Sequence, residues 1–204
     1  MKRFVTILLA FSALTSFAQG SVDDFFAKVG DSQVSFSYTF SVNAQTKIQG
    51  SGAVTVQDNA FKMSGNGLEV WCDGASRWTV DASGKEAVIE SVEENEATRY
   101  SANPALLLSN LDKAFVRTKS ATDKFQGKKA WAVYLEPQVS CDVSLVKLYF
   151  VSSVLEGASV IVEDGTQTDF VFSGWKFNEK AESLSAFRFD ESSLGKDYVV
   201  TDLR

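Results

Sequence analysis

The chain has 204 residues, a formal net charge of −6 and no histidine. An acidic chain of this kind lacks the basic surface on which nucleic-acid binding depends, so no nucleic-acid partner is expected. Without histidine, acid–base catalysis would fall to carboxylates, lysine or tyrosine. No phosphate-binding loop, dinucleotide fingerprint or nucleophile elbow is present. Composition therefore favours a protein that is not an enzyme and needs no cofactor.

Residues 1–18 are typical of a secretory signal peptide. Lys2 and Arg3 precede an apolar run over residues 4–11, and Ser16-Phe17-Ala18 has the small-x-small pattern of a cleavage site. The alternative is an N-terminal membrane anchor, which needs about 20 apolar residues and is disfavoured by the shorter run. We expect cleavage after residue 18, a periplasmic protein, and one β domain over residues 19–204.

Residues 21–29 (SVDDFFAKV) predict an amphipathic helix that ends near Gly30. Ser21 is suited to capping, and the apolar residues recur at spacings of three and four. The apolar face indicates packing onto a core. The adjacent Phe25 and Phe26 also suit a lid over an apolar cavity.

Residues 34–42 (VSFSYTFSV) predict a strand, because apolar and hydroxyl side chains alternate strictly along it. A register slip of one residue would expose the aromatic side chains. Residues 47–92 then predict a meander of short strands. Turn residues separate these strands at Asp58-Asn59, Asn66-Gly67, Asp73-Gly74 and Ser83-Gly84. A meander of this size favours a sandwich or a barrel.

The second half of the chain predicts one helix and further strands. Asn103-Pro104 begins a leucine-rich helix that continues to Leu111, and Phe115-Val116 is a short strand. Strands are predicted over residues 130–136 and 143–152, and a hairpin over residues 155–175 turns at Asp164-Gly165. The last extended piece covers residues 198–203.

The two cysteines, Cys72 and Cys141, lie far apart in the sequence. Export would place them in an oxidising compartment, where a disulfide between them could form. The alternative is two separate buried thiols, and the sequence does not separate these readings. Neither reading gives a metal site, because two cysteines without histidine are too few for structural zinc.

Several short motifs recur in a fixed order. GAVTV at residues 52–56 precedes FKM at residues 61–63, CDG at residues 72–74 and WTVD at residues 78–81, and the chain closes on FRFDESSLGKDYVV. Together with the leucine-rich helix, this order resembles the LolA family, the periplasmic carriers of outer-membrane lipoproteins. The family's closing motif is matched at Phe187, Phe189, Gly195, Asp197 and Val199.

The chain departs from the family pattern at Gln57 and Asp58. The family often has Arg-Pro there, and the arginine holds the lid helices closed. Lys62 is the nearest cation, but it is expected to point away from Phe61 and Met63 and to be solvated. The family's second aromatic is Met63 here, and its tyrosine is Val80.

The resemblance implies a mainly β fold with two short lid helices, an incomplete antiparallel β-barrel. It implies an apolar cavity lined by Phe36, Tyr38, Phe40, Val54, Phe61, Met63 and Trp78. It implies a lid formed by Phe25, Phe26, Leu107 and Leu111. The implied function is a carrier, or chaperone, of acylated lipoproteins. It would take them from an inner-membrane exporter and deliver them to the outer membrane, where a receptor could accept them.

Two alternatives remain open at this point. A lipid or lipopeptide sensor would use the same cavity to report on mislocalised lipid. A secreted hydrolase would instead need two carboxylates that converge in a cleft, at least one of them with a raised pKa.

Overall fold

The computed structural model describes residues 22–43, 48–92, 100–101, 103–109, 111–181 and 183–204. The predicted signal peptide lies outside these residues. Within them, no helix combines the length and the apolarity that crossing a membrane requires.

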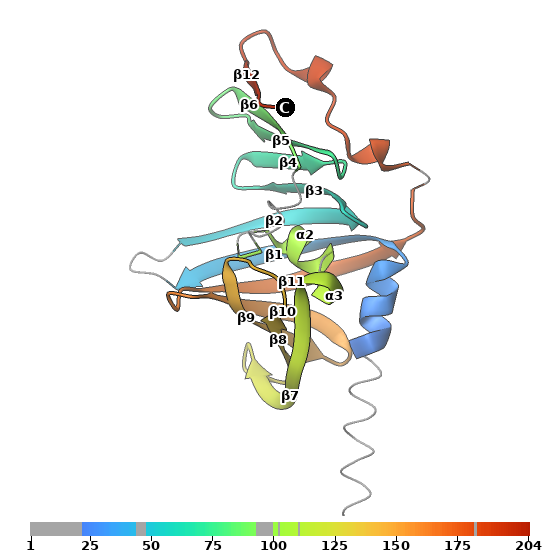
Figure 1. Cartoon of the computed structure of the whole chain (residues 1–204), viewed down its shortest axis with the longest axis vertical. Helices are drawn as coiled ribbons and strands as arrows, with labels where there is room; N and C mark the ends of the chain where they lie inside the picture. Colours follow the sequence, from blue (N-terminus) through green and yellow to red (C-terminus); the bar gives the residue numbers. More distant parts are fainter. Residues whose placement is uncertain (1–21, 44–47, 93–99, 102, 110, 182) are drawn as a thin grey trace, which may run out of the picture.

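The described strands form one sheet with the order β12-β6-β5-β4-β3-β2-β1-β11-β10-β9-β8-β7 (Figure 1). Every neighbouring pair is antiparallel except β12 with β6. The strands are β1 (Gln33–Asn43), β2 (Ile48–Gln57), β3 (Ala60–Gly65), β4 (Leu68–Cys72), β5 (Ser76–Asp81), β6 (Glu86–Ser91), β7 (Phe115–Phe125), β8 (Lys128–Pro137), β9 (Val143–Val151), β10 (Val154–Val162), β11 (Gln167–Asn178) and β12 (Val199–Asp202). Among the described strands, β7 and β12 are the two edges and do not pair with each other, so the sheet is open. The predicted incomplete antiparallel barrel is confirmed.

Tight turns give the sheet its meander. Asn66 (φ 52°) and Gly67 (φ 83°) join β3 to β4, and Gln126 (φ 50°) and Gly127 (φ 76°) join β7 to β8. Positive φ at both central residues is typical of the two-residue turns whose twist matches that of paired strands. The turns predicted from Asn-Gly and Asp-Gly sequences therefore lie where the sequence indicated.

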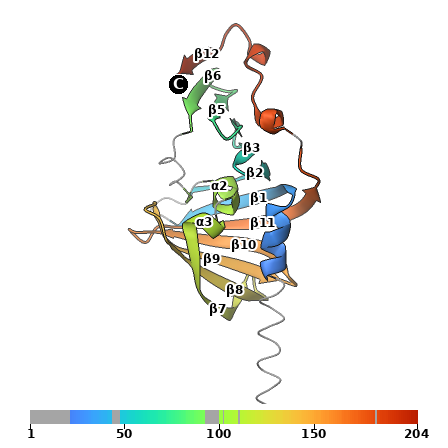
Figure 2. The same cartoon turned by 45° about the vertical axis from the view of Figure 1, so that its right-hand side comes forward.

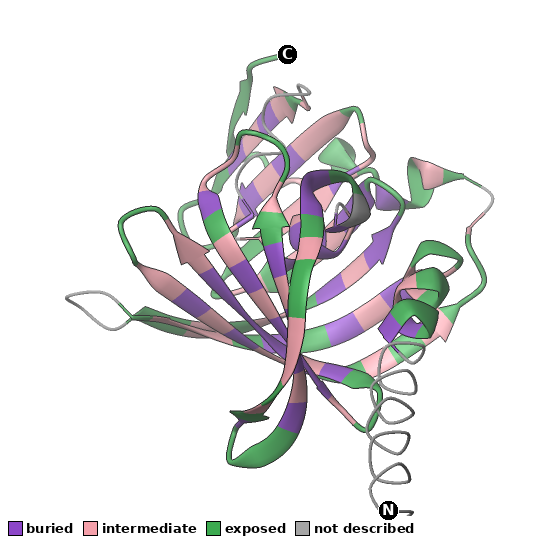
Figure 3. Cartoon of the chain, turned by 60° about the horizontal axis from the view of Figure 1, so that its bottom comes forward, coloured by how far each residue is buried: buried purple, intermediate pink, exposed green. Residues whose placement is uncertain are grey.

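The three described α-helical segments lie on one face of the sheet (Figure 2). Residues 22–30 form the first, and α2 (Pro104–Ser109) and α3 (Leu111–Ala114) form the others. The side-chain oxygen of Asn103 accepts hydrogen bonds from the backbone of Ala105 (2.9 Å) and Leu106 (3.2 Å), which caps α2. Buried and exposed residues alternate along the strands, and the helices lie within the curve of the sheet (Figure 3).

Two elements differ from the prediction. The strand expected at Phe115-Val116 extends to Phe125, because its polar residues are accommodated on an edge strand that is largely exposed. The chain after β11 does not continue the meander. It crosses to the far end of the sheet through the 3-10 helices η1 (Leu184–Phe187) and η2 (Glu191–Ser193), and β12 then pairs in parallel with β6.

Candidate functional site

The concave face of β1–β3 is apolar and carries six of the seven residues expected to line a cavity. Strand pairing places Phe36 opposite Val54, and Val54 opposite Met63. Directly paired residues share one face of a sheet. These six residues, all part of or packed against one buried cluster, are Phe36, Tyr38, Phe40, Val54, Phe61 and Met63.

Trp78 does not belong to this face, which corrects the prediction. Strand pairing places Lys62 opposite Trp71, and Trp71 opposite Trp78. Since Lys62 alternates with Phe61 and Met63, Trp78 lies on the convex side. Its indole Nε1 donates to Glu191 Oε1 (2.9 Å). The length of the loop over residues 73–75 decides which face of the sheet each residue of β5 occupies. The alternation within β5 alone does not show this.

The second half of the sheet supplies aromatic residues that the prediction missed. Trp175 stacks on Phe36, with 4.5 Å between ring centroids, and Phe172 meets Phe36 edge-on at 5.4 Å. Phe170 lies 6.2 Å from Tyr38. The spacing of Phe170 and Phe172 predicts that both lie on one face of a strand. It does not predict that this strand pairs with β1, which is more than a hundred residues earlier in the sequence.

A bulge in β11 brings Trp175 onto the concave face. The register between β1 and β11 shifts between Ser35 and Ser37, and Gly174 has φ of 69° in this stretch. An extra residue reverses the alternation, so Trp175 and Phe177 share a face with Phe172 despite their odd spacing. The indole of Trp175 donates to the Leu155 carbonyl oxygen (2.8 Å).

The helical segments contact this face through rings and leucines. Phe25 meets Phe150 (5.6 Å), Trp175 (5.2 Å) and Phe177 (5.9 Å) edge-on. Phe26 lies 5.9 Å from Phe150. From α2 and α3, the residues expected in a lid that are buried in the same cluster are Leu107 and Leu111.

Few polar contacts tie the helices to the sheet. Arg117 on β7 pairs with Asp23 at 2.7 Å. Gln138 donates from its side chain to the Lys113 carbonyl (3.1 Å) and from its backbone to the Ala114 carbonyl (2.8 Å), which fixes the end of α3. Lys28 Nζ also lies over the ring of Phe177 on β11, 4.4 Å from its centroid. Apolar packing supplies most of the rest of the described interface between the helices and the sheet.

Gln57 and Asp58, where the sequence departs from the family pattern, make their polar contacts with the C-terminal segment. Gln57 is 3% exposed, and its amide donates to the Ala181 carbonyl (3.1 Å) and accepts from the Ala181 backbone (2.8 Å). Asp58 pairs with Lys180 at 2.6 Å. Both residues therefore fix the start of the C-terminal segment rather than the lid helices.

Lys62 points away from Phe61 and Met63, as expected, but it is only half-exposed. Its Nζ lies 4.1 Å from the ring centroid of Trp71 and 5.9 Å from that of Phe187. Burial lowers the pKa of its ammonium group. The convex side of β3–β5 is thus covered by residues 183–204, in which Phe187 is buried and Phe189 meets Trp71 at 5.6 Å.

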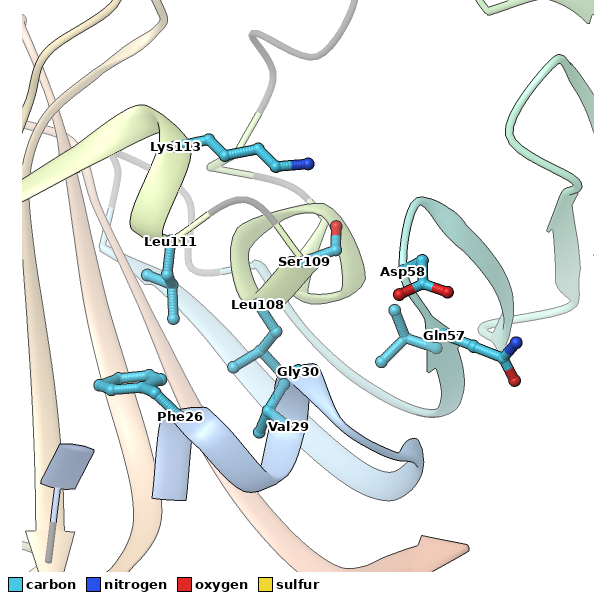
Figure 4. Close-up of a pocket in the computed structure, with 10 residues that line it drawn as sticks. Phe26, Val29, Gly30, Gln57, Asp58, Leu108, Ser109, Leu111 and Lys113 are labelled. Atoms are coloured by element: carbon cyan, nitrogen blue, oxygen red, sulfur yellow. The ribbon is translucent and has the colours of Figure 1, made fainter. Parts of the chain in front are cut away.

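A pocket opens between residues 22–30, the α2–α3 segment and the turn that joins β2 to β3 (Figure 4). We call it the mouth pocket. Its volume is about 240 Å³. The residues that line it are Phe26, Val29, Gly30, Val56, Gln57, Asp58, Leu108, Ser109, Leu111 and Lys113.

The two cysteines are not bridged in the structure. The thiol of Cys72 lies buried 3.8 Å from the Asn59 carbonyl, and that of Cys141 lies 3.5 Å from the Val143 carbonyl. Burial raises the pKa of both thiols. The structure therefore contradicts the disulfide and supports the alternative of two separate thiols. Among the described residues, no group of three potential metal ligands is found.

The sequence matches no protein-family model and no curated protein. Among solved structures, the chain is similar to an uncharacterized conserved protein from Thermus thermophilus. Identity is 10%, the TM-score is 0.51, and the match covers 90% of this chain and 98% of that chain. A LolA superfamily protein from Nitrosomonas europaea is similar at 10% identity and a TM-score of 0.49, with 84% and 97% covered. A DUF1329 family protein from Desulfovibrio piger matches at 11% identity and a TM-score of 0.46, with 87% and 99% covered.

The likeness to the Thermus protein concerns the fold alone. The open, antiparallel-rich sheet curled around helical segments agrees with the incomplete β-barrel that the motif resemblance implied.

Proposed function

We propose that this chain is a periplasmic carrier that shelters the acyl chains of lipoproteins on its concave face and delivers them to the outer membrane. The observation that carries this proposal is the contact between the helices and the sheet. Phe25 and Phe26 meet Phe150, Trp175 and Phe177 ring to ring, with few polar bonds across the interface.

Because this interface is mainly apolar, acyl chains could replace the helices on the concave face. Exposing an acyl chain to water costs about 0.8 kcal/mol per CH₂ group. If the helices move aside, acyl chains can cover the concave face in their place, and the apolar area kept from water stays nearly constant. Binding and release then need no covalent chemistry and little net free energy.

The hydrolase alternative gains no support from the described carboxyl groups. Those with a shifted pKa are all shifted downward. The backbone of Gly84 lowers the pKa of Asp81, the backbone of Thr166 lowers that of Asp164, and the side chain of Arg204 lowers that of Asp202 to about 2. A general acid would need the opposite shift.

The test uses two neighbouring positions on β1. Phe40 lies half-buried on the concave face and Thr39 lies exposed on the convex face. We would purify the wild-type chain, Phe40→Asp and Thr39→Asp from a periplasmic fraction and identify bound lipophilic material by mass spectrometry. Acylated peptides should be present on the wild type and on Thr39→Asp, and absent or much reduced on Phe40→Asp.

Equal loading of both variants would contradict the proposal, provided that circular dichroism shows both to be folded. A loaded wild-type chain would then be mixed with outer-membrane vesicles. A carrier should transfer the acylated peptide to the vesicles, whereas retention would favour the sensor.

A further inference from the structure

The mouth pocket has an apolar side and a polar side (Figure 4). The apolar side is formed by Phe26, Val29, Val56, Leu108 and Leu111, and it adjoins the buried cluster of the concave face. The polar side is formed by Gln57, Asp58, Ser109 and Lys113. An apolar pocket with a few polar groups at one side is the usual form of a small-molecule site.

Among the described residues, the polar side has one cation, Lys113, that no carboxylate pairs with. The amide of Gln57 is occupied by Ala181, and the carboxylate of Asp58 by Lys180 at 2.6 Å. No carboxylate pairs with Lys113 among the described residues, and its side chain extends over the pocket toward Ser109 (Figure 4). The ammonium group of Lys113 is therefore available to an anion in the pocket.

The size of the pocket restricts the ligand further. About 240 Å³ is less than the roughly 300–1,000 Å³ of sites that enclose drug-sized molecules. A pocket of this volume has room for a small head group and the first part of one chain, and is too small for an anchor with several acyl chains.

We propose that the mouth pocket binds an acyl chain that ends in an anionic group, with Lys113 as the counter-ion and the chain directed toward Leu108 and Leu111. This inference rests on the proposed function, since it takes the concave face to be the place where the chain continues. A charge-assisted hydrogen bond from a lysine recognises a carboxylate and a phosphate alike. The two head groups are separated by experiment.

Isothermal titration calorimetry would measure four twelve-carbon probes below their micellar concentrations: dodecanoate, dodecyl phosphate, neutral dodecyl maltoside and cationic dodecyltrimethylammonium. The proteins are the wild type, Lys113→Gln, Lys113→Arg and the control Lys129→Gln. Lys129 is also exposed, but it lies on β8, outside the pocket.

One of the two anionic probes should bind the wild type about tenfold more tightly than dodecyl maltoside, the effect of one charged contact. Lys113→Gln should remove this preference and leave maltoside binding unchanged, while Lys113→Arg and Lys129→Gln should retain it. If maltoside binds as tightly as the anions, or if Lys113→Gln keeps the preference, the inference fails and the proposed carrier function stands. If no probe binds the wild type, the inference fails, and the proposed carrier function is decided separately by the loading experiment with Phe40→Asp.

Discussion

The indole ring of Trp175 stacks on the ring of Phe36, with 28° between the two planes. This contact joins β11 to β1 at the bulge and places the largest aromatic side chain of β11 under the helix of residues 22–30. The stacking also holds the indole N–H of Trp175 in place to donate to the Leu155 carbonyl. Leu155 lies where the register between β9 and β10 shifts.

Replacing Trp175 by phenylalanine should therefore cost stability through one lost hydrogen bond. The ring packing is largely kept, but the Leu155 carbonyl loses its donor in a residue that is 0% exposed. We expect the free energy of unfolding to fall by about 1–3 kcal/mol, measured by urea denaturation.

The matched control for this change is Trp131→Phe. Trp131 packs against the same cluster from β8, and no hydrogen bond from its indole is found among the described residues. An equal loss of stability in both variants would show that ring size, not the hydrogen bond, decides the effect.

Gln57→Ala should loosen the C-terminal segment. Both hydrogen bonds to Ala181 are lost, and we expect a destabilisation of about 1–3 kcal/mol, because the backbone groups of Ala181 lose their partner in a partly buried place. Hydrogen exchange over residues 183–204 should become faster. Asp58→Asn removes only the surface pair with Lys180 and should change stability by less than about 1 kcal/mol. Unchanged exchange in Gln57→Ala would contradict this account.

Lys62 should make stability depend on alkaline pH. Burial lowers the pKa of its ammonium group in the folded chain below the ordinary value of 10.5. Between these two pKa values the unfolded chain binds more protons than the folded chain, so stability rises with pH in this window. The unfolding free energy of the wild type should therefore increase relative to that of Lys62→Met as pH rises toward 10.5. A difference that stays constant over this range would refute the assignment.

The thiols of Cys72 and Cys141 should both react with iodoacetamide after denaturation without a reductant, adding two carbamidomethyl groups by mass. In the folded chain, Cys141 should react faster than Cys72, since Cys141 is half-exposed and Cys72 is 3% exposed. The raised pKa of each thiol reduces its thiolate fraction at neutral pH, so both rates should lie below that of free cysteine. An unreactive denatured chain would mean that a disulfide forms after all.

Local sequence determined much of this protein. The alternation from Val34 to Val42 fixed both the strand and its apolar face, and the Asn-Gly and Asp-Gly pairs fixed where the meander turns. Asn103-Pro104 fixed the start of α2. Each of these signals depends on neighbouring residues only, because side-chain periodicity and positive φ are local properties.

Tertiary structure decided which faces meet. The pairing of β1 with β11 joins residues more than a hundred positions apart, so Trp175 and Phe170 could not be assigned to the concave face from the sequence. The same holds for Trp78, whose side is set by the loop before β5. Gln57 was noted as a departure from a family pattern, but its role depends on a distant backbone, that of Ala181. Periodicity specifies that a strand has an apolar face, and only long-range strand pairing specifies what that face covers.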